Sequence, residues 1–382
     1  MKNGYNPLSE EVWAEPSIGY RHLLEEEPVH FFEAFDPPFY TLSRFADVQA
    51  ALLDIETYSS EWGQGPRFSP PGGMLSNPPQ HTFYRGLVQQ AFTPRAIAEW
   101  GERITALSEE LLDQRTGTQA WDLHDDYAFP LPVIVISEML GVPGDDLQKF
   151  KHWSDITVEA MGAEDPTPFA AEMGELAAYL LNTIRQRRAE PQEDLISALV
   201  VAEQDGKGLA DEELLGVVNQ LFVGGNETTT SLITNMIWRL LQDRSLWERL
   251  VQDPGLIDIA IEESLRFDPP VLGLYRTTTR EVEMEGGTIP KDAKVMMHYA
   301  AANRDPATFE SPNDFSLDRE RSRHLGFGLG VHFCLGAPLA RLEARIALRT
   351  LLQRCPDLQL LGDGERIAPF FLWGRRRLPV TG

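Results

Sequence analysis

A cysteine surrounded by glycines is the first place where this sequence could carry chemistry. Residues 327–336, FGLGVHFCLG, hold Cys334 just before an apolar helical pattern, and Pro338 suits the first turn of that helix. A thiol near a helix N-terminus meets backbone N–H groups and the positive end of the helix dipole, which favour the thiolate. The thiolate is the metal-binding form and one of the few protein groups that bind haem iron axially. A lone cysteine is more often a buried structural thiol, but the Phe, Gly and His spacing favours a ligand here.

A second unusual stretch lies in the middle of a long helical pattern. Residues 211–242 place apolar side chains at helical spacing, which predicts a buried helix, yet the centre reads GGNETTT. Each of Gly224 and Gly225 costs about 1 kcal/mol relative to Ala inside a helix. Two interpretations stay open: the glycines let a flat, bulky group lie directly on the backbone, or they let another helix pack tightly.

The same stretch contains an alcohol beside an acid. Thr228 follows Gly224 by four residues, so its hydroxyl can donate to that carbonyl and widen the helix locally. Glu227 supplies a titratable carboxyl group next to it. An alcohol and a carboxylate inside an apolar helix suit proton delivery, provided that the acid is connected to solvent.

Composition excludes several classes of protein. The 382 residues are 42% hydrophobic and 24% charged, as in an ordinary globular protein with a large core. A net charge of -24 repels phosphate backbones, so we expect no nucleic-acid partner. Two cysteines exclude a disulfide scaffold, and the sequence shows neither a signal-peptide pattern nor an apolar run of about 18 residues. We therefore expect a cytoplasmic, monomeric protein that binds no membrane.

The apolar spacing predicts a mainly α protein with small β-sheets, folded as a single domain over residues 1–382 because no linker or repeat divides it. Helical spacing covers 81–113, 130–140, 145–162, 168–188, 193–204, 211–242, 245–266 and 337–354. The pieces VHFF, PFYTLS, VEMEGGTIP and AKVMMHYAAA predict strands. The Gly- and Pro-rich segment 61–80 predicts a long loop, and IAPFFLWG before three arginines predicts a returning hairpin or loop.

Positive charge gathers toward the C-terminal end. From Arg319 onward, eleven arginines stand against five acidic residues, a net charge of +6. Such asymmetry marks either a docking face for an acidic partner or a solvated helix face, and both interpretations stay open.

Taken together, these motifs resemble the cytochrome P450 superfamily, specifically its bacterial haem-thiolate monooxygenases. FGLGVHFCLG resembles the family's cysteine loop, VGGNETT its oxygen-activating helix motif, and EESLR its ExxR pair, in the family's order. The resemblance extends from about residue 30 to Pro379. It implies a single-domain fold that encloses a haem between a long central helix and the cysteine loop with its helix.

The resemblance carries roles to individual residues. It implies that Cys334 binds the haem iron and that Glu227 and Thr228 take the catalytic acid and alcohol positions. The other implied cofactor-binding residues are His81, Arg85, Gly224, Gly225, Arg276, Phe327, His332 and Gly336, of which His81, Arg85, Arg276 and His332 would contact the haem propionates.

Further residues are implied to support the site. Glu263 and Arg266 correspond to the family's structural ExxR pair, which helps to lock the cysteine loop, and Arg319 is a weaker candidate for their third partner. Asn226 stands where bacterial members often have His, and its role stays open.

The implied activity is insertion of one O2-derived oxygen atom into a hydrophobic small molecule of terpenoid, steroid, fatty-acid or aromatic type, with haem b as cofactor. The sequence has no fingerprint for a nicotinamide, a flavin or an iron–sulfur cluster. We therefore expect an acidic ferredoxin and its reductase to supply electrons, docking at the basic C-terminal stretch. Two alternatives are a peroxide-driven haem-thiolate enzyme, which would not need the Glu227–Thr228 pair, and a non-catalytic haem protein that senses gas or stores a ligand.

Pocket walls are predicted only by position in the family fold. The candidates are the 61–76 loop, Phe222, Val223, Val271, Leu272, Leu274, Phe371 and Leu372. Each of these is equally plausible as ordinary core.

Overall fold

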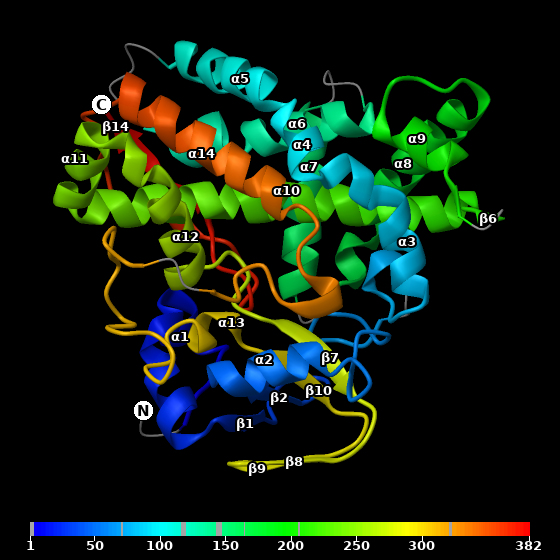
Figure 1. The fold of residues 1–382 in the computed structure, drawn as a ribbon, viewed down its shortest axis with the longest axis vertical. Coiled ribbons are helices and arrows are strands. Elements are labelled where there is room, and N and C mark those ends of the chain that lie inside the picture. Colours follow the sequence, from blue (N-terminus) through cyan, green and yellow to red (C-terminus); the bar gives the residue numbers. More distant parts are fainter. Residues whose placement is uncertain are drawn as a thin grey trace. The chain divides into compact units, whose positions relative to one another are not determined.

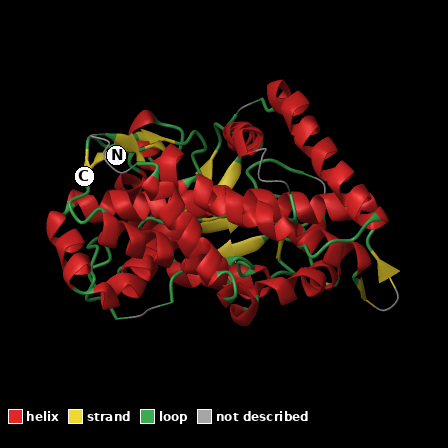
Figure 2. Ribbon diagram, turned by 90° about the horizontal axis from the view of Figure 1, so that it is seen from above, coloured by secondary structure: helices red, strands yellow, loops and turns green. Residues whose placement is uncertain are grey.

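Helices make up most of the described chain, and its strands are short, as the sequence predicts (Figure 2). The computed structural model describes residues 4–69, 72–115, 120–142, 147–163, 165–204, 207–320 and 323–382. Residues 70 and 71 of the predicted 61–76 loop, residues 145 and 146 of the predicted helix 145–162, and Arg321 of the basic stretch lie outside this part. No helix of the described residues is both long enough and apolar enough to span a bilayer.

The chain divides into two compact units, each built from segments that are distant in sequence. The first unit contains Met1–Asn77, Glu262–Cys334 and Phe370–Trp373, and the second contains Pro78–Ile261, Leu335–Pro369 and Gly374–Gly382.

The second unit is organised around helix α10 (Asp211–Gln242), which Figure 1 shows as a long green helix. It is contacted by α6 (Pro130–Leu140), α7 (Leu147–Gly162), α8 (Ala170–Ala189) and α14 (Ala337–Arg354). Neighbours on several sides explain why buried residues occur around much of its circumference. Burial of these side chains against four helices compensates for the low helix propensity of its GGNETTT centre.

The start of α10 follows ordinary rules of helix capping. Three acidic residues, Asp211, Glu212 and Glu213, occupy its first turn, where the positive end of the helix dipole stabilises them. The Glu213 carboxylate also accepts a hydrogen bond from the Ala210 backbone N–H at 3.0 Å. The helix therefore begins where the sequence predicts.

The prediction of one continuous helix over 81–113 is wrong. The segment contains α3 (Gln80–Val88), α4 (Pro94–Ala98) and α5 (Gly101–Asp113). Thr93 is extended, with φ -66° and ψ 150°, because the ring of Pro94 disfavours helical backbone in the residue before it. The Thr93 hydroxyl then accepts from the Ala96 N–H at 3.3 Å and caps a new helix.

Proline also divides the predicted helix 245–266. It consists of α11 (Arg244–Gln252) and α12 (Ile257–Phe267), separated at Asp253 and Pro254. The predicted helix 193–204 is confirmed only as the shorter α9 (Leu195–Val201), which Asp194 caps by accepting from the Ser197 N–H at 2.7 Å.

The first unit holds a five-stranded sheet in the order β1-β2-β10-β7-β3. Its strands are β1 (Val29–Phe32), β2 (Phe39–Leu42), β10 (Lys294–Met297), β7 (Leu274–Thr278) and β3 (Tyr58–Ser59). The pair β10 and β2 is parallel and the other pairs are antiparallel. Helix α2 (Phe45–Leu53) contributes apolar side chains to the same core as this sheet.

The predicted strand AKVMMHYAAA is correct only in its first half. After β10, the residues Tyr299–Ala302 form the short helix α13. The His298 Nδ1 accepts a hydrogen bond from the Ala301 N–H at 3.2 Å, and this cap, followed by three alanines, favours helix over strand.

The strands predicted in VEMEGGTIP form a hairpin, and the tail forms the hairpin that is one of the two alternatives predicted for it. Strands β8 (Val282–Met284) and β9 (Gly287–Ile289) pair around the Gly-Gly turn. In the tail, β12 (Glu365–Arg366) pairs with β13 (Arg375–Arg377), and β14 (Pro379–Thr381) joins a small sheet with β11 (Gln359–Leu360) and β4 (Trp121–Asp122).

Replacing Gly141 by Ala should lower the stability of the protein. Gly141 ends α6 with a φ of +78°, and an added Cβ would collide with the Asp194 carboxylate, which is ion-paired with Arg187. A residue other than glycine in this conformation costs about 1–2 kcal/mol, and moving the carboxylate costs more. Thermal unfolding followed by circular dichroism should show a Tm several degrees lower.

Gly174→Ala is the matched control. Gly174 lies within α8, and an added Cβ there meets no heavy atom within 4 Å. This change should stabilise the helix by up to about 1 kcal/mol. Equal Tm values for the two variants would contradict the strain assigned to Gly141.

Candidate functional site

The cysteine loop is a tight turn in the first unit. Its backbone closes through the Cys334 N–H, which donates to the Phe327 carbonyl at 2.9 Å, and the Phe333 N–H, which donates to Gly330 at 3.1 Å. Gly328 and Gly330 have φ values of +68° and +74°, which only glycine adopts at low cost. The glycine spacing recognised in the sequence is therefore required by the path of the backbone.

The thiol lies just ahead of a helix, as predicted. Cys334 is half-buried and forms no disulfide with Cys355, the other cysteine of the chain. Helix α14 begins three residues later at Ala337, with Gly336 preceding it and Pro338 in its first turn. The Gly336 carbonyl accepts from the Ala340 N–H at 2.9 Å and so starts the helix.

His332 is held by a neighbouring loop of the same unit. Its Nε2 lies 3.0 Å from the Ser60 Oγ, and the Ser60 N–H donates to the Asn77 side-chain oxygen at 3.0 Å. The ring of Phe327 lies 6.3 Å from that of Phe333 in an edge-on contact. These contacts hold the side chains on both sides of the cysteine turn.

Arg276, the predicted propionate contact of this unit, is a buried cation on β7. Its guanidinium donates to the Tyr275 carbonyl at 2.8 Å, and no carboxylate of the described residues forms an ion pair with it. Burial lowers its pKa, and the nearby Tyr299 opposes this shift. A buried guanidinium of this kind suits an added anion such as a carboxylate.

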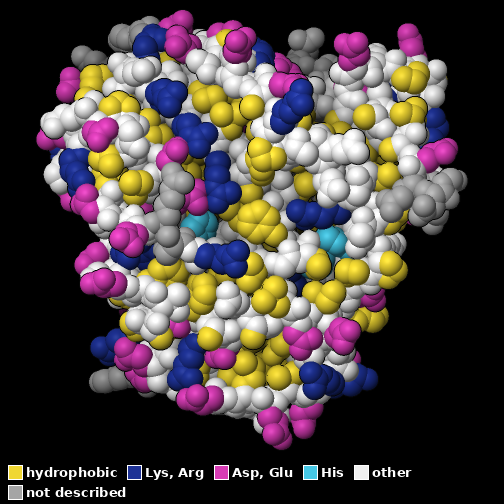
Figure 3. Space-filling view, in the orientation of Figure 1, with side chains coloured by type: hydrophobic (Ala, Val, Ile, Leu, Met, Phe, Trp, Pro, Cys, Tyr) yellow, Lys and Arg dark blue, Asp and Glu magenta, His cyan; other side chains and the backbone are white. Residues whose placement is uncertain are grey.

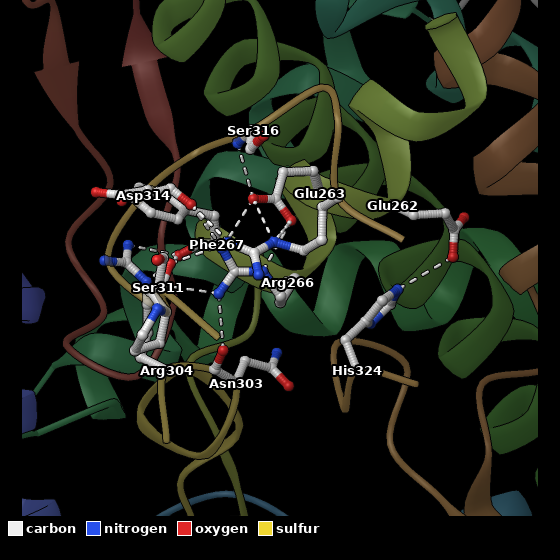
Figure 4. Close-up of polar contacts among 12 residues, drawn as sticks. Glu262, Glu263, Arg266, Phe267, Asn303, Arg304, Ser311, Asp314, Ser316 and His324 are labelled. Atoms are coloured by element: carbon white, nitrogen blue, oxygen red, sulfur yellow. Dashed lines mark hydrogen bonds and ion pairs between the residues drawn. The ribbon is translucent and has the colours of Figure 1, made fainter. Parts of the chain in front are cut away.

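The first unit also contains a buried ion pair at the predicted ExxR motif (Figure 4). Glu263 and Arg266 on α12 share two hydrogen bonds of 2.8 Å, and both side chains are almost completely buried. Arg319 donates from Nε to Glu263 at 3.0 Å, so the weaker candidate for the third partner does contact the pair. The Ser316 N–H completes the coordination of Glu263 at 3.0 Å.

Arg266 connects this pair to the cysteine loop through Asn303. Its guanidinium donates to the Asn303 carbonyl at 2.9 Å, and the Asn303 side-chain oxygen accepts from the Leu325 N–H at 2.7 Å. Leu325 in turn accepts from the Gly328 N–H at 2.8 Å. Asn303 was missed by sequence reasoning, because a single Asn in AAANRD has no spacing that points to a distant loop.

Lys294 is a second residue that sequence reasoning missed. It is buried on β10, and its ammonium group donates to the Trp62 and Gly63 carbonyls at 2.7 and 3.1 Å. Burial and then the charge of Arg276 lower its pKa to about 8. Lys294 thus holds part of the predicted 61–76 loop on the sheet. The feature of the sequence that indicates such a role is a lysine inside the apolar strand AKVMM.

In the second unit, α10 carries the predicted alcohol and acid. The Thr228 Oγ1 donates to the Gly224 carbonyl at 2.8 Å, the bond predicted from their spacing. Glu227 is buried and accepts from the Ser231 Oγ at 3.3 Å. Burial raises the pKa of Glu227 to about 7, and the charge of His124 opposes this rise. Near neutral pH, Glu227 can both donate and accept a proton.

The two glycines of α10 have different surroundings. An added Cβ at Gly225 would lie 3.3 Å from two side-chain carbons of Ile136, so this glycine permits tight packing on α6. An added Cβ at Gly224 would meet no heavy atom within 4 Å. Helix packing therefore explains Gly225, whereas Gly224 leaves bare backbone on which a flat group can lie.

The other two predicted propionate contacts belong to the second unit. His81 and Arg85 lie four residues apart on α3 and therefore on one face of that helix. His81 is buried, and both burial and the charge of Arg85 lower its pKa.

The predicted pocket residues divide by environment. Phe222 is packed against Phe150 of α7 with ring centroids 5.2 Å apart, as expected of core. In the first unit, the Leu272 N–H donates to the Phe371 carbonyl at 2.9 Å, and Val271 forms a β-bridge with Leu372. Val223 and Leu274 are only half-buried.

Basic side chains lie over α14 on the face drawn in Figure 3. Arg345 forms an ion pair with Asp258 at 2.7 Å, and Arg354 forms one with Asp113 at 2.7 Å. Part of the basic charge predicted to dock a partner is therefore paired within the second unit.

Comparison with known proteins identifies relatives over nearly the whole chain. A model described as cytochrome P450 matches residues 168–360. A putative cytochrome P450, YjiB, from Bacillus subtilis is 40% identical over 90% of this chain and 88% of its own length. A vitamin D(3) 25-hydroxylase from Pseudonocardia autotrophica is 38% identical over 97% of this chain and 94% of its own length. The structure of CYP109E1 from Bacillus megaterium in complex with testosterone matches with a TM-score of 0.89 and 33% identity, covering 98% of this chain and 99% of that one.

Replacing Glu263 by Gln should destabilise the first unit strongly. The change leaves the buried guanidinium of Arg266 without its carboxylate, and breaking a buried ion pair in this way costs about 3–5 kcal/mol. Thermal unfolding should occur at a clearly lower temperature, or the variant should fail to accumulate as folded protein.

The adjacent Glu262 offers the control. It is only partly buried and contacts His324 Nε2 at 3.1 Å. Glu262→Gln should change the Tm little, because the Gln side-chain oxygen can still accept the hydrogen bond from His324 Nε2. A Glu263→Gln variant as stable as Glu262→Gln would show that the pair is not required.

Proposed function

This chain belongs to the cytochrome P450 family and is a P450 monooxygenase, and we propose that it inserts one atom of O2 into a hydrophobic small molecule with Cys334 as the thiolate ligand of its haem iron. The observation that carries this assignment is the cysteine loop, where glycines at positive φ and the Cys334–Phe327 hydrogen bond hold the thiol just ahead of α14. The haem-thiolate group supplies O2 activation and favours O–O cleavage.

The residues present suit a haem, which we propose is haem b. Arg276 offers a buried guanidinium that has no carboxylate partner among the described residues, and His332 belongs to the same loop as Cys334. We assign these two, together with His81 and Arg85, to the haem propionates. Gly224, where an added Cβ would meet open space, is assigned to the face of the ring, and Gly225, Phe327 and Gly336 to the surrounding shell.

We propose that residues of α10 control the delivery of protons during the reaction. The Thr228 hydroxyl is oriented by its bond to Gly224, and Glu227 is buried with a pKa of about 7. Glu227 would supply protons, and the Thr228 hydroxyl would hold the proton donor in position. This division of roles favours an O2-dependent reaction over a peroxide-driven one, because peroxide already carries the protons.

The substrate is proposed to be an apolar molecule of terpenoid, steroid, fatty-acid or aromatic type. Support comes from relatives whose names specify vitamin D(3) and testosterone. Shifts of the ferric haem spectrum on adding testosterone, a fatty acid or a terpene would rank these classes.

Electrons are proposed to come from a ferredoxin and its reductase. The arginines of α14 would contribute positive charge to the docking of an acidic partner. A monomer, a cytoplasmic location and one haem domain over residues 1–382 stay predictions from the sequence.

Replacing Cys334 by Ser should abolish the thiolate signature. The wild type, reduced and exposed to carbon monoxide, should show a strongly red-shifted Soret band, because thiolate donates electron density to the iron. The variant should lose that band. Cys355→Ser is the control and should keep it; an unchanged spectrum for Cys334→Ser would refute the assignment.

Replacing Thr228 by Val should uncouple electron use from product formation. The variant keeps the shape of Thr228 but loses the hydroxyl, so more hydrogen peroxide should be released per NADH consumed. Thr230→Val, which removes a buried hydroxyl two residues further along α10, is the matched control and should stay coupled. Equal peroxide yields from the two variants would show that the hydroxyl of Thr228 has no special role.

A further inference from the structure

Lys294 is a buried cation in the five-stranded sheet of the first unit. Only 1% of it is exposed, and on β10 it lies opposite Phe39 of β2 and Thr277 of β7. No carboxylate of the described residues forms an ion pair with its ammonium group. Burial and then the charge of Arg276 lower its pKa to about 8, so the group still carries its charge at neutral pH. Since a buried charge is costly unless its donors are satisfied, its contacts must compensate for burial.

The contacts of this ammonium group all lie in one loop, residues 60–69. It donates to the Trp62 carbonyl at 2.7 Å and to the Gly63 carbonyl at 3.1 Å. It also lies 5.0 Å from the centroid of the Phe68 ring, a distance at which the face of the ring attracts a cation. The Ser69 N–H closes the loop by donating to the same Trp62 carbonyl at 3.1 Å. One side chain of the sheet thus holds both the start and the end of the loop.

The same loop is attached beside two residues that we assign to the haem propionates. The Ser60 Oγ lies 3.0 Å from His332 Nε2, and the Gln64 carbonyl accepts from the Tyr275 N–H at 2.9 Å. Tyr275 immediately precedes Arg276 on β7. The loop is therefore fixed next to both propionate contacts that belong to the first unit.

Two large aromatic side chains of this loop are exposed. Trp62 is 53% exposed and Phe68 is 48% exposed, although aromatic side chains of this size are usually more buried. Covering such rings with an apolar molecule supplies binding free energy, and ring-on-ring contact adds to it. Exposed rings that are fixed beside a cofactor site are therefore suited to contact an apolar ligand.

We propose that Lys294 is a positioning residue for substrate: by holding the loop on the sheet, it fixes Trp62 and Phe68 as an aromatic surface for a ligand bound beside the haem. This inference rests on the proposed function and narrows its substrate class to rigid ring systems of steroid or aromatic type. Such molecules present flat faces to the two rings and lose less conformational freedom on binding than a flexible alkyl chain does.

The variant Lys294→Met tests this role in the haem-loaded full chain. Met is of similar size but has neither the charge nor the donors, and replacing a buried charged group by an apolar one is often tolerated. Lys291→Met is the control, because the Lys291 side chain is 63% exposed in the turn before β10.

Two probes bind the haem iron through an imidazole nitrogen and differ in what they carry. Clotrimazole carries aromatic rings, and dodecylimidazole carries a flexible alkyl chain. Titrations followed by the shift of the Soret band give the affinity of each probe. Because the iron ligand is the same in both, the comparison isolates the contacts made by the substituents.

Lys294→Met should bind clotrimazole about tenfold more weakly than the wild type, because the two rings are no longer held in one place. Its affinity for dodecylimidazole should fall about twofold at most, since an alkyl chain depends less on ordered rings. Lys291→Met should match the wild type with both probes. Unchanged clotrimazole binding in Lys294→Met, or equal losses for the two probes, would overturn the proposal.

A double-mutant cycle with Trp62→Ala separates positioning from general damage to the sheet. Trp62→Ala changes an exposed side chain and should by itself weaken clotrimazole binding selectively. Adding Lys294→Met to Trp62→Ala should then weaken binding much less than adding it to the wild type, because two residues that act through one contact are not additive. Full additivity, or a Trp62→Ala variant that binds clotrimazole as the wild type does, would contradict the role of the loop.

Hydrogen exchange gives a measurement that depends on no ligand. In Lys294→Met the backbone amides of Gly63 and Ser69, which close the loop, should exchange faster than in the wild type. The amides of the β8–β9 hairpin, which Lys294 does not contact, should exchange at the same rate. Wild-type exchange throughout the loop would show that Lys294 does not hold it.

The two levels of inference can fail separately. A wild type without the red-shifted carbon monoxide band, or one that binds neither azole, would contradict the proposed function. If that band is present, both azoles bind and Lys294→Met still behaves as the wild type, only the role of Lys294 is wrong.

Discussion

The ion pair between Glu263 and Arg266 is the constraint on which much of the first unit depends. Two charges almost fully removed from water are tolerated only when their hydrogen-bonding groups are satisfied. The structure satisfies them with Arg319 and the Ser316 N–H on one side and backbone carbonyls, including that of Asn303, on the other. Asn303 also accepts a hydrogen bond from the Leu325 N–H. The residue that helps to satisfy the buried guanidinium therefore also holds the backbone that leads into the cysteine loop.

The main feature of the second unit is a titratable carboxyl group, that of Glu227, inside the buried helix α10. Burial raises the pKa of Glu227 to about 7, which an exposed glutamate would not reach. Gly224 and Gly225 lower the helix propensity of the segment around it. Packing of α10 against α6, α7, α8 and α14 compensates for this loss. The local departures from helix propensity thus lie where uncovered backbone and a buried carboxyl group occur together on α10.

Two glycines next to each other illustrate how one sequence feature can serve two purposes. Gly225 gives room to Ile136 of α6, whereas Gly224 leaves backbone uncovered. Helix packing, one of the two interpretations that the sequence left open, therefore explains Gly225, while the open space at Gly224 leaves room for the flat group of the other. The same lesson applies to the pocket candidates, where Phe222 belongs to the core and Val223 is half-buried.

The sequence by itself determined the family, the mainly α fold and the elements built on local periodicity, together with the Thr228–Gly224 bond, because these depend on residues close together in the chain. It overestimated helix continuity at Pro94 and Pro254, where the missing N–H and the restricted preceding residue outweigh apolar spacing. Only the tertiary structure decided that Arg319 contacts Glu263, that Asn303 connects Arg266 to the cysteine loop, and that Lys294 holds a distant loop on the sheet. Such contacts join residues from different elements, and one sequence contains no spacing from which they can be inferred.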